Sequence, residues 1–472
     1  MSRLKKLFIG DRAFYRAVLM IILPVIVQNG ISNFVSLLDN LMVGGMGTNE
    51  MSGVSVANQL VFVFNLALFG GLSGPGIFTA QFFGANDTEG VRNTFRVKIW
   101  LGLAVAAVSI LVFTVFGDSL YQLFLTGEAT GEGVDAEKIF QSAREYMQVI
   151  VFGLPLWGLS QAYATNLRET GDAFWPMVAS VASVLTNLFG NWVLIYGQLG
   201  FPALGVQGAA IATVASRGVE LLVVVLRTHR HPEKYPFIKG AFRKLTVPVS
   251  LLKDICKAGL PLLVNETLWS IGLSVQSMIL SASGLEVVGA LSISSTISNL
   301  FRVVSYSMGT AVSVMVGQSL GANRFEEAKA QEWRLIFFGI VLAIVTGGLL
   351  FAFAGLIPEA YTNVLPEVRS LATAMLKISA IMTPIDIFTH CAYFAFRAGG
   401  KSMVTFLFDC GFTWVVTVSA TYLAVKVLGM SIIPAFALVY ATDLLKAGAG
   451  YLLLRSEFWV RNIVDNQRSV QA

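Results

Sequence analysis

The sequence predicts an all-α integral membrane protein with 12 transmembrane helices, arranged as two related six-helix halves. Three observations lead to this prediction. Hydrophobic residues make up 55% of the 472 residues and charged residues only 13%, whereas soluble domains carry about 25% charged residues. Twelve separate runs are apolar and long enough to cross a bilayer, which takes about 20 residues for each helix. The second half of the chain repeats the pattern of the first.

The twelve runs follow one another along the whole chain. The second and eighth, roughly residues 54–83 and 287–318, are longer than a span needs and rich in Gly and Ser. We expect tilted or bent helices that pack closely on their neighbours there. The runs centre near Val27, Phe64, Val108, Leu154, Thr186, Ala215, Trp269, Ser305, Leu342, Pro384, Trp414 and Leu444.

Several functions are excluded by motifs that do not occur. The sequence contains no GxxxxGK[ST], HExxH or GxSxG pattern, and GGLSGPG at residues 70–76 lies inside an apolar run and lacks the lysine of a phosphate loop. Three cysteines and three histidines show no metal-ligand spacing. We therefore expect neither an enzyme nor an ATP-driven pump, and no cofactor or certain metal site.

Basic residues predict the orientation in the membrane. Of the 33 Lys and Arg residues, 25 fall in one alternating set of loops, which includes both termini and residues 227–257. The other set holds Lys138, Arg144, Arg369 and Lys426. The positive-inside rule then places both termini in the cytoplasm of a cell with the protein in its inner (cytoplasmic) membrane. Because the positive charge is segregated by loop, we expect no nucleic-acid partner.

An internal repeat divides the chain. QFFGAN at residues 81–86 matches QSLGAN at 318–323 with an offset of 237, and Pro155 and Gly171 match Pro384 and Gly400 with an offset of 229. Each repeat has six spans, so the two are parallel, a build typical of secondary transporters. We predict an N-lobe at 1–227, a basic cytoplasmic linker at 228–253 and a C-lobe at 254–472.

The acids inside the spans differ between the repeats. Asp39 aligns with Gln276, Glu266 aligns with an asparagine, and Asp386 aligns with Trp157. The shared scaffold therefore does not require carboxylates at these positions. Ionisable residues inside a membrane are functional candidates by default.

Asp39 is the leading candidate for ion coupling. No Lys or Arg lies within a helical turn of it, and burial without a cationic partner favours the protonated form. It can exchange a proton or bind Na⁺, although a structural hydrogen bond is the alternative. Asn187 and Asn191 lie one turn apart on one helix face. With Thr213 they could ligate a cation or simply bond neighbouring helices.

A second cation or substrate site is predicted in the C-lobe. Glu266, with Gln276 in the same span, could accept a cationic substrate or a second ion. Asp386 and His390, one turn apart, could form a proton relay or a self-neutralised pair. Asp409 lies near the cytoplasmic end of its span, where a solvated or capping role is the main alternative.

We interpret two further pairs of oppositely charged residues as structural ion pairs. Arg217 with Glu220, and Asp443 with Lys446, each lie three residues apart on one helix and can neutralise each other. Bases within the spans are few, and four acids stand against them; the bases are Arg217, Arg302, Lys377 and Lys446, and the acids are Asp39, Glu266, Asp386 and Asp409. This balance favours cationic substrates over anionic ones.

The sequence resembles the multidrug and toxic compound extrusion family, bacterial type. The resemblance rests on ILPVIVQNGISNFVSLLDNLMVGGMG, FTAQFFGAND, GLPLLVNETLWSIG, GQSLGANRFEEAK and FRAGGKS, and it covers essentially the whole chain. It implies two six-helix lobes around a V-shaped central cavity. It also implies multidrug efflux of small organic cations by antiport with H⁺ or Na⁺.

The resemblance also assigns roles to residues. The family's first-helix acid falls on Asp39 and its kink-forming proline on Pro24. An Asn-xxx-Asp pair on the fifth helix reads Asn187-xxx-Asn191 here, with Thr213 as the hydroxyl. Because the second acid is missing, H⁺ is favoured over Na⁺; a bound Na⁺ would be expected at Asp39 or Glu266.

Two points complete the expectations from the resemblance. The family's seventh-helix and tenth-helix acids fall on Glu266 and Asp386. A flippase or exporter of a lipid-linked sugar, from the same superfamily, is the alternative function, and it predicts a strongly cationic cavity. We expect a monomer in the lipid bilayer.

Overall fold

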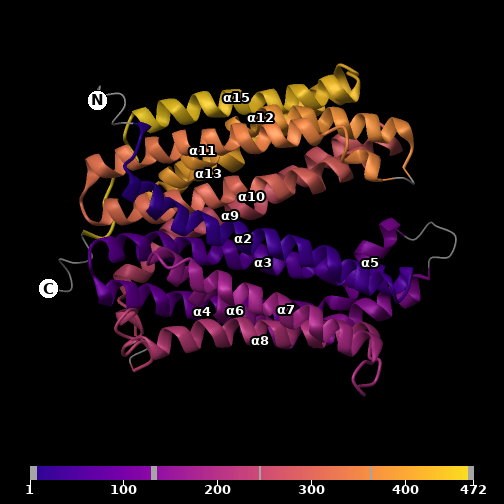
Figure 1. Ribbon diagram of the computed structural model, residues 1–472, viewed down its shortest axis with the longest axis horizontal. Helices are drawn as coiled ribbons and strands as arrows, with labels where there is room; N and C mark the ends of the chain where they lie inside the picture. Colours follow the sequence, from indigo (N-terminus) through magenta and orange to yellow (C-terminus); the bar gives the residue numbers. More distant parts are fainter. Residues whose placement is uncertain (1–7, 129–134, 244–245, 362–363, 466–472) are drawn as a thin grey trace. The chain divides into compact units, whose positions relative to one another are not determined.

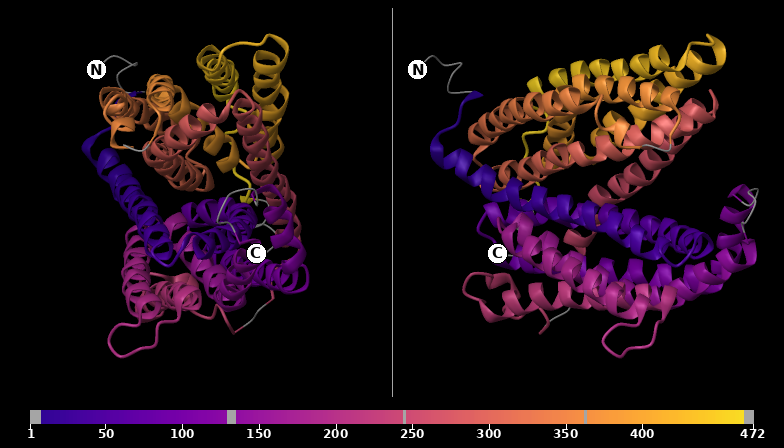
Figure 2. Two further views of the ribbon diagram at one scale, coloured as in Figure 1. Left: turned by 90° about the vertical axis from the view of Figure 1, so that its right-hand side faces the viewer. Right: turned by 45° about the vertical axis from the view of Figure 1, so that its right-hand side comes forward.

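A computed structural model describes residues 8–128, 135–243, 246–361 and 364–465 of the chain, without the side chains of residues 35–37, 39–41 and 123–128. Every regular element in the described part is a helix (Figures 1 and 2). The segment GGLSGPG lies inside a continuous helix, which agrees with its exclusion as a phosphate loop. All twelve predicted spans coincide with long helical segments.

The first repeat contains six long helices and one short one. They are α2 (Arg12–Gly44), α3 (Thr48–Gly84), α4 (Thr88–Val115), α5 (Gly117–Glu128), α6 (Ala136–Glu169), α7 (Phe174–Tyr196) and α8 (Gly205–Arg230). The 3₁₀ turn η1 (Pro236–Ile238) follows in the linker. Helix α3 has 37 residues, so the long second span is confirmed.

The second repeat follows the same order. It contains α9 (Val249–Ser281), α10 (Leu285–Gly321), α11 (Phe325–Phe353), the turn η2 (Pro358–Ala360), α12 (Pro366–Ala398) and α15 (Ile432–Arg455). Between α12 and α15 the eleventh span is built from α13 (Ser402–Phe406), η3 (Leu407–Gly411), η4 (Thr413–Val418), α14 (Ser419–Tyr422) and η5 (Leu423–Val427). The stretches η3, η4 and η5 are π-helical.

Ten helices of the described part are apolar and long enough to cross a membrane. Helices α6 and α9 are as long but are not among these ten. Helix α9 carries Asn265 and Glu266 at its centre. These two residues of α9 belong to a candidate site described below.

The chain forms two compact units. The N-unit comprises Val27–Thr79 and Thr88–Leu252, and the C-unit comprises Met1–Ile26, Ala80–Asp87 and Lys253–Ala472. The units follow contacts rather than the repeat, because the start of α2 and the end of α3 pack with the second half. The lobe boundaries predicted from the repeat stay a prediction.

The N-unit packs α8 against α6 and α7, and α6 against α4. Gly102 and Gly158 let α4 and α6 meet backbone to backbone, since an added Cβ on Gly102 would lie 2.7 Å from the Gly158 carbonyl oxygen. The linker is docked on this unit. Arg96 Nε donates to the Ala241 carbonyl at 2.8 Å.

Asp172 holds the start of the linker. It accepts hydrogen bonds from Lys234 Nζ and the Tyr235 hydroxyl, both at 2.7 Å. Burial opposes the charged form, but these bonds outweigh burial and lower the pKa of Asp172. The polar linker thus has fixed contacts on the N-unit.

The C-unit packs α10, α11 and α15 around α12. The start of α2 joins this core through Phe14, Val18 and Ile22. The two halves of the repeated QxxGAN motif interlock here. An added Cβ on Gly84 would collide with the Gln318 carbonyl, and one on Gly321 with the Gln81 carbonyl.

The segment after α15 completes the C-unit. Gln81 Nε2 donates to the carbonyls of Ala398 and Arg461, at 2.8 and 3.2 Å, and its Oε1 accepts from the Ile463 amide at 2.8 Å. Trp459 is almost fully buried. The end of the chain is therefore fastened to the end of α3.

Candidate functional site

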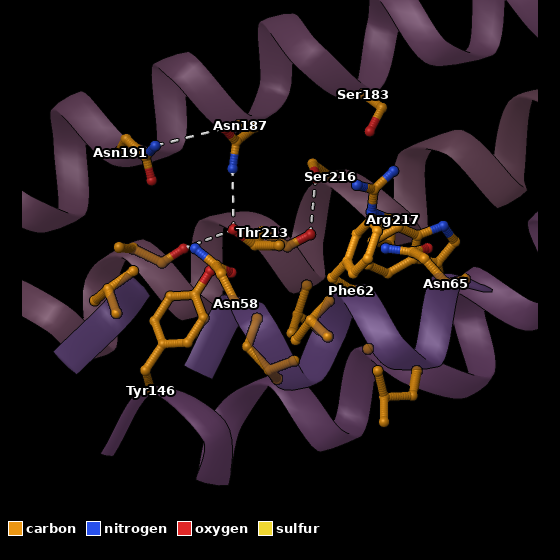
Figure 3. Close-up of a pocket in the computed structure, with 18 of the residues that line it drawn as sticks. Asn58, Phe62, Asn65, Tyr146, Ser183, Asn187, Asn191, Thr213, Ser216 and Arg217 are labelled. Carbon is orange, nitrogen blue, oxygen red and sulfur yellow. Dashed lines mark hydrogen bonds between the residues drawn. The ribbon is translucent and has the colours of Figure 1, made fainter. Parts of the chain in front are cut away.

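The N-unit contains a cavity of about 510 Å³ between α2, α3, α6, α7 and α8 (Figure 3). This volume is in the range of small-molecule sites, roughly 300–1,000 Å³. Its wall combines aromatic side chains with amides and hydroxyls. The polar lining residues include Ser32, Ser55, Asn58, Gln59, Asn65, Tyr146, Ser180, Ser183, Asn187, Asn191, Thr213, Ser216 and Arg217.

The three neutral residues predicted for ion coupling meet at this cavity. Asn187 Nδ2 lies 3.2 Å from Thr213 Oγ1, and Asn191 Nδ2 lies 3.4 Å from Asn187 Oδ1. Figure 3 shows this chain of contacts between α7 and α8. Both asparagines are buried. Two amide oxygens and one hydroxyl are therefore close together, although their role in ion binding stays a prediction.

A charged side chain, stacked on an aromatic ring, lies at the other end of the cavity. The Arg217 guanidinium lies 3.8 Å above the Trp157 ring. It also bonds Glu220 at 2.9 Å, and Gln161 Nε2 donates to the same carboxylate at 3.4 Å. The predicted Arg217–Glu220 pair is confirmed. Figure 3 shows Arg217 between Ser183 and Asn65.

Asp39 lies in α2, but its side chain is outside the described residues. Two features of its helix are described. Pro24 lies inside α2, and the chain passes from the C-unit to the N-unit between Ile26 and Val27. A proline removes one helical hydrogen bond and disposes a helix to bend, so the bend is predicted next to the boundary of the units.

The C-unit holds a polar network around Glu266. The Tyr393 hydroxyl donates to Glu266 at 3.0 Å. Asn265 Nδ2 lies 3.3 Å from the Tyr393 hydroxyl and 3.1 Å from Asp409. Lys446 Nζ bonds Asp409 at 2.7 Å.

Two interpretations from the sequence are corrected here. Lys446 pairs with Asp409, from another helix, and not with Asp443 three residues away. Asp409 is largely buried, with 16% of its side chain exposed, so it has no solvated or capping role. The π-helical stretch η3 brings Asp409 and the Cys410 amide to Asn265.

Asp386 belongs to a separate set of contacts. It accepts a hydrogen bond from Ser305 at 2.7 Å, and it lies 3.7 Å from Arg302 and 3.5 Å from His390. Arg302 as well as His390 thus lies beside Asp386, and the proton relay and the self-neutralised pair both stay predictions. Gln276 lies ten residues beyond Glu266, about 15 Å further along α9, so it does not join the Glu266 network.

Several side chains that contact the candidate site residues could not be predicted from the sequence. Tyr393, Ser305 and Trp157 carry no charge and lie far along the chain from the groups they contact. Arg302 was visible as a base within a span, but its pairing with Asp386 was not. Among the described residues, no group of three or more His, Cys, Asp and Glu side chains could hold a metal ion.

The chain matches the MatE family over residues 24–193 and 261–423. The chain belongs to the MatE family. The resemblance found in the motifs is therefore confirmed, and this MatE protein is a multi-pass membrane transporter and not an enzyme.

Relatives match most of the chain. A protein of Thermotoga maritima named probable multidrug resistance protein NorM is 23% identical over 457 residues, covering 95% of this chain and 94% of the relative. A protein of Bacillus subtilis named probable multidrug resistance protein YoeA is 27% identical over 339 residues, covering 71% and 70%.

Solved structures confirm the predicted fold. A crystal structure of MATE in the bent conformation has a TM-score of 0.83 at 21% identity and covers 97% of both chains. The Vibrio cholerae MATE transporter VcmN has a TM-score of 0.83 at 17% identity, covering 95% of this chain and 98% of the other. The all-α fold with twelve transmembrane helices is thus confirmed for this MatE protein.

Proposed function

We propose that this protein is a secondary active multidrug efflux antiporter, which exports small organic cations in exchange for H⁺ or Na⁺. The observation that carries the proposal is the N-unit cavity, where Asn187, Asn191 and Thr213 meet. The names of the two relatives, both probable multidrug resistance proteins, support drug-sized cargo. The proposal includes a monomer in the inner membrane, with both termini cytoplasmic.

Asp39 is proposed as the main coupling carboxylate. By helical spacing, position 39 lies on the same face of α2 as Ser32 and Val43, seven and four residues away, and both of these line the cavity. The neutral Asn187, Asn191 and Thr213 would contribute oxygen ligands but no charge. We therefore favour H⁺ as the coupling ion, with Na⁺ at Asp39 as the alternative.

The transport cycle is proposed to use the bend at Pro24. Occupation of Asp39 by the ion would bend α2 near the boundary between the units and contract the N-unit cavity, so that cargo leaves. Ion and cargo must compete or stabilise opposite states, because a ligand shifts an equilibrium only by its differential affinity.

A second cation site in the C-unit is proposed around Glu266 and Asp409, with Asp386 and His390 nearby. Lys446 already neutralises Asp409, and Arg302 and His390 lie beside Asp386. Glu266 has no ion pair among the described residues, and it accepts a hydrogen bond from the Tyr393 hydroxyl. It is therefore the best candidate for an ion in this unit.

The test is efflux of a fluorescent organic cation from proteoliposomes under a pH gradient or a Na⁺ gradient, imposed separately. We expect a pH gradient alone to drive efflux by the wild type, and Asp39→Asn to lose at least about tenfold in rate, as expected for loss of a group that exchanges protons. Glu137→Gln, an exposed acid of the N-unit, serves as the control. Efflux driven by Na⁺ that survives Asp39→Asn would move the coupling site to the C-unit.

A further inference from the structure

Arg217 in the first repeat corresponds to a basic residue in the second repeat. With the offset of 229, Thr213 and Arg217 of α8 correspond to Thr442 and Lys446 of α15. The same offset holds across the preceding span, because Gly200 and Gly429 correspond and both have positive φ, +84° and +59°. The register between α7 and the eleventh span is thus fixed at both ends by glycines, since Gly171 and Gly400 also have positive φ.

In the C-unit, this position is occupied by an ion pair. Lys446 Nζ bonds the Asp409 carboxylate at 2.7 Å. With the same offset Asp409 corresponds to Ser180. At the corresponding positions the N-unit therefore has a base and a small hydroxyl, where the C-unit has a base and a carboxylate.

In the N-unit, both positions line the open cavity. Arg217 and Ser180 are among its lining residues, and Arg217 is the one charged residue among the described residues that line the cavity. The Arg217 side chain is 27% exposed, whereas that of Glu220 is only 4% exposed. Glu220 bonds one terminal nitrogen of the guanidinium and does not line the cavity.

The guanidinium keeps hydrogen-bonding capacity beyond Glu220. Arginine has five N–H donors, and stacking on Trp157 fixes the plane of the group without using one of them. Ser183 and Asn65, at the same end of the cavity, offer further neutral donors (Figure 3). Arginine prefers carboxylates because its planar fork matches their two oxygens.

We propose that Arg217 and Ser180 form a subsite for an anionic group of the cargo, first of all a carboxylate. The bound carboxylate takes the place that the Asp409 side chain has beside Lys446. The proposal rests on the proposed efflux function, and it predicts a preference for drug-sized zwitterions, with the positive group left for the coupling carboxylate proposed at Asp39. This subsite lies within a single unit.

A matched pair of dyes tests the subsite. Tetramethylrhodamine carries a positive charge and a free carboxylate, whereas its methyl ester carries only the positive charge. Binding to the purified full chain is measured by fluorescence polarisation, and efflux is measured in proteoliposomes. We expect the wild type to bind the free acid about tenfold or more tightly than the ester, as for a hydrogen bond to a charged group.

Two variants act in different ways. The double variant Arg217→Gln/Glu220→Gln removes the charge without leaving Glu220 unpaired, and it should weaken binding of the free acid about tenfold or more but leave the ester unchanged. Ser180→Asp copies the C-unit and supplies a carboxylate to Arg217. It should likewise weaken binding of the free acid and leave binding of the ester unchanged.

The control variant is Arg144→Gln/Asp118→Asn, an exposed pair of the same unit, which should change neither affinity. Binding of the methyl ester shows that a variant is folded. If the double variant no longer binds the ester, the result for Ser180→Asp alone tests the subsite. The proposal is wrong if Ser180→Asp changes the affinity for both dyes equally, or if it leaves the affinity for the free acid unchanged. Absence of efflux of both dyes by the wild type would instead refute the proposed function.

Discussion

Lys98 and Glu332 are both fully buried ionisable side chains, and they differ in the partners that the protein supplies. Lys98 Nζ lies 3.1 Å from Asn166 Oδ1 and is paired with Glu169. Both carboxylate oxygens of Glu332 lack a hydrogen-bond partner among the described residues. A buried polar group costs about 1–3 kcal/mol when it is left without a partner.

Removing the two side chains should therefore have opposite effects on stability. Glu332→Met keeps the length of the side chain and removes its polar atoms, so we expect stabilisation by about 1–3 kcal/mol. Lys98→Met breaks the buried pair with Glu169, and breaking a buried pair costs about 3–5 kcal/mol. Thermal unfolding in detergent measures both. A loss of stability in Glu332→Met would show that this carboxylate has a partner.

Helix α3 is divided between the two units. It contains Pro75, and four residues later the chain passes from the N-unit to the C-unit, between Thr79 and Ala80. Helix α2 passes between the units two residues after Pro24. Both helices thus carry a proline beside a crossing, and the end of α3 is fixed in the C-unit by Gln81 and Gly84.

The close contact at Gly84 predicts a sharp size limit. Gly84→Ala would place a Cβ against the Gln318 carbonyl, and such overpacking costs about 1–3 kcal/mol. Gly348→Ala is the matched control, because Gly348 lies inside α11 with no atom within 4 Å of an added Cβ. The control should be neutral or stabilising by up to about 1 kcal/mol. Equal melting temperatures for the two variants would contradict this packing.

The elements were predictable from the sequence, but their cross-helix partners were not. Hydrophobic runs and turn glycines predict each helix within itself, so all twelve spans and the Arg217–Glu220 pair follow from local spacing. Asp409 illustrates what local spacing misses. Its partner Lys446 is 37 residues away, and the π-helical stretch around it re-aims the side chain, which no periodicity reveals.

At the scale of the whole molecule, the chain crosses between the units four times. The crossings follow Ile26, Thr79, Asp87 and Leu252. The candidate ion and cargo residues of the first repeat lie in the N-unit, whereas Glu266 and Asp386 lie in the C-unit. If Asp39 is the coupling carboxylate, as proposed, ion and cargo would compete within one unit, and Pro24 and Pro75 are the candidate bending points beside the crossings.

Competition at Asp39 predicts how cargo affinity depends on pH. If the deprotonated carboxylate binds the positive group of the cargo, the Kd of a cationic dye falls as pH rises, by at most about tenfold per pH unit for one proton. Tetramethylrhodamine methyl ester suits this test, since its own charge does not titrate. Its Kd should be measured between pH 6 and 8 at constant Na⁺ concentration.

The variant Asp39→Asn should lose this slope while keeping a measurable affinity, because proton release and dye binding are linked through the same group. A slope that persists in Asp39→Asn would assign the exchanged proton to another group, with Glu266 the first to test. If the Kd does not depend on pH but rises with Na⁺ concentration, the competing ion is Na⁺ and not H⁺. Linkage is reciprocal, so the dye must weaken binding of that ion by the same factor.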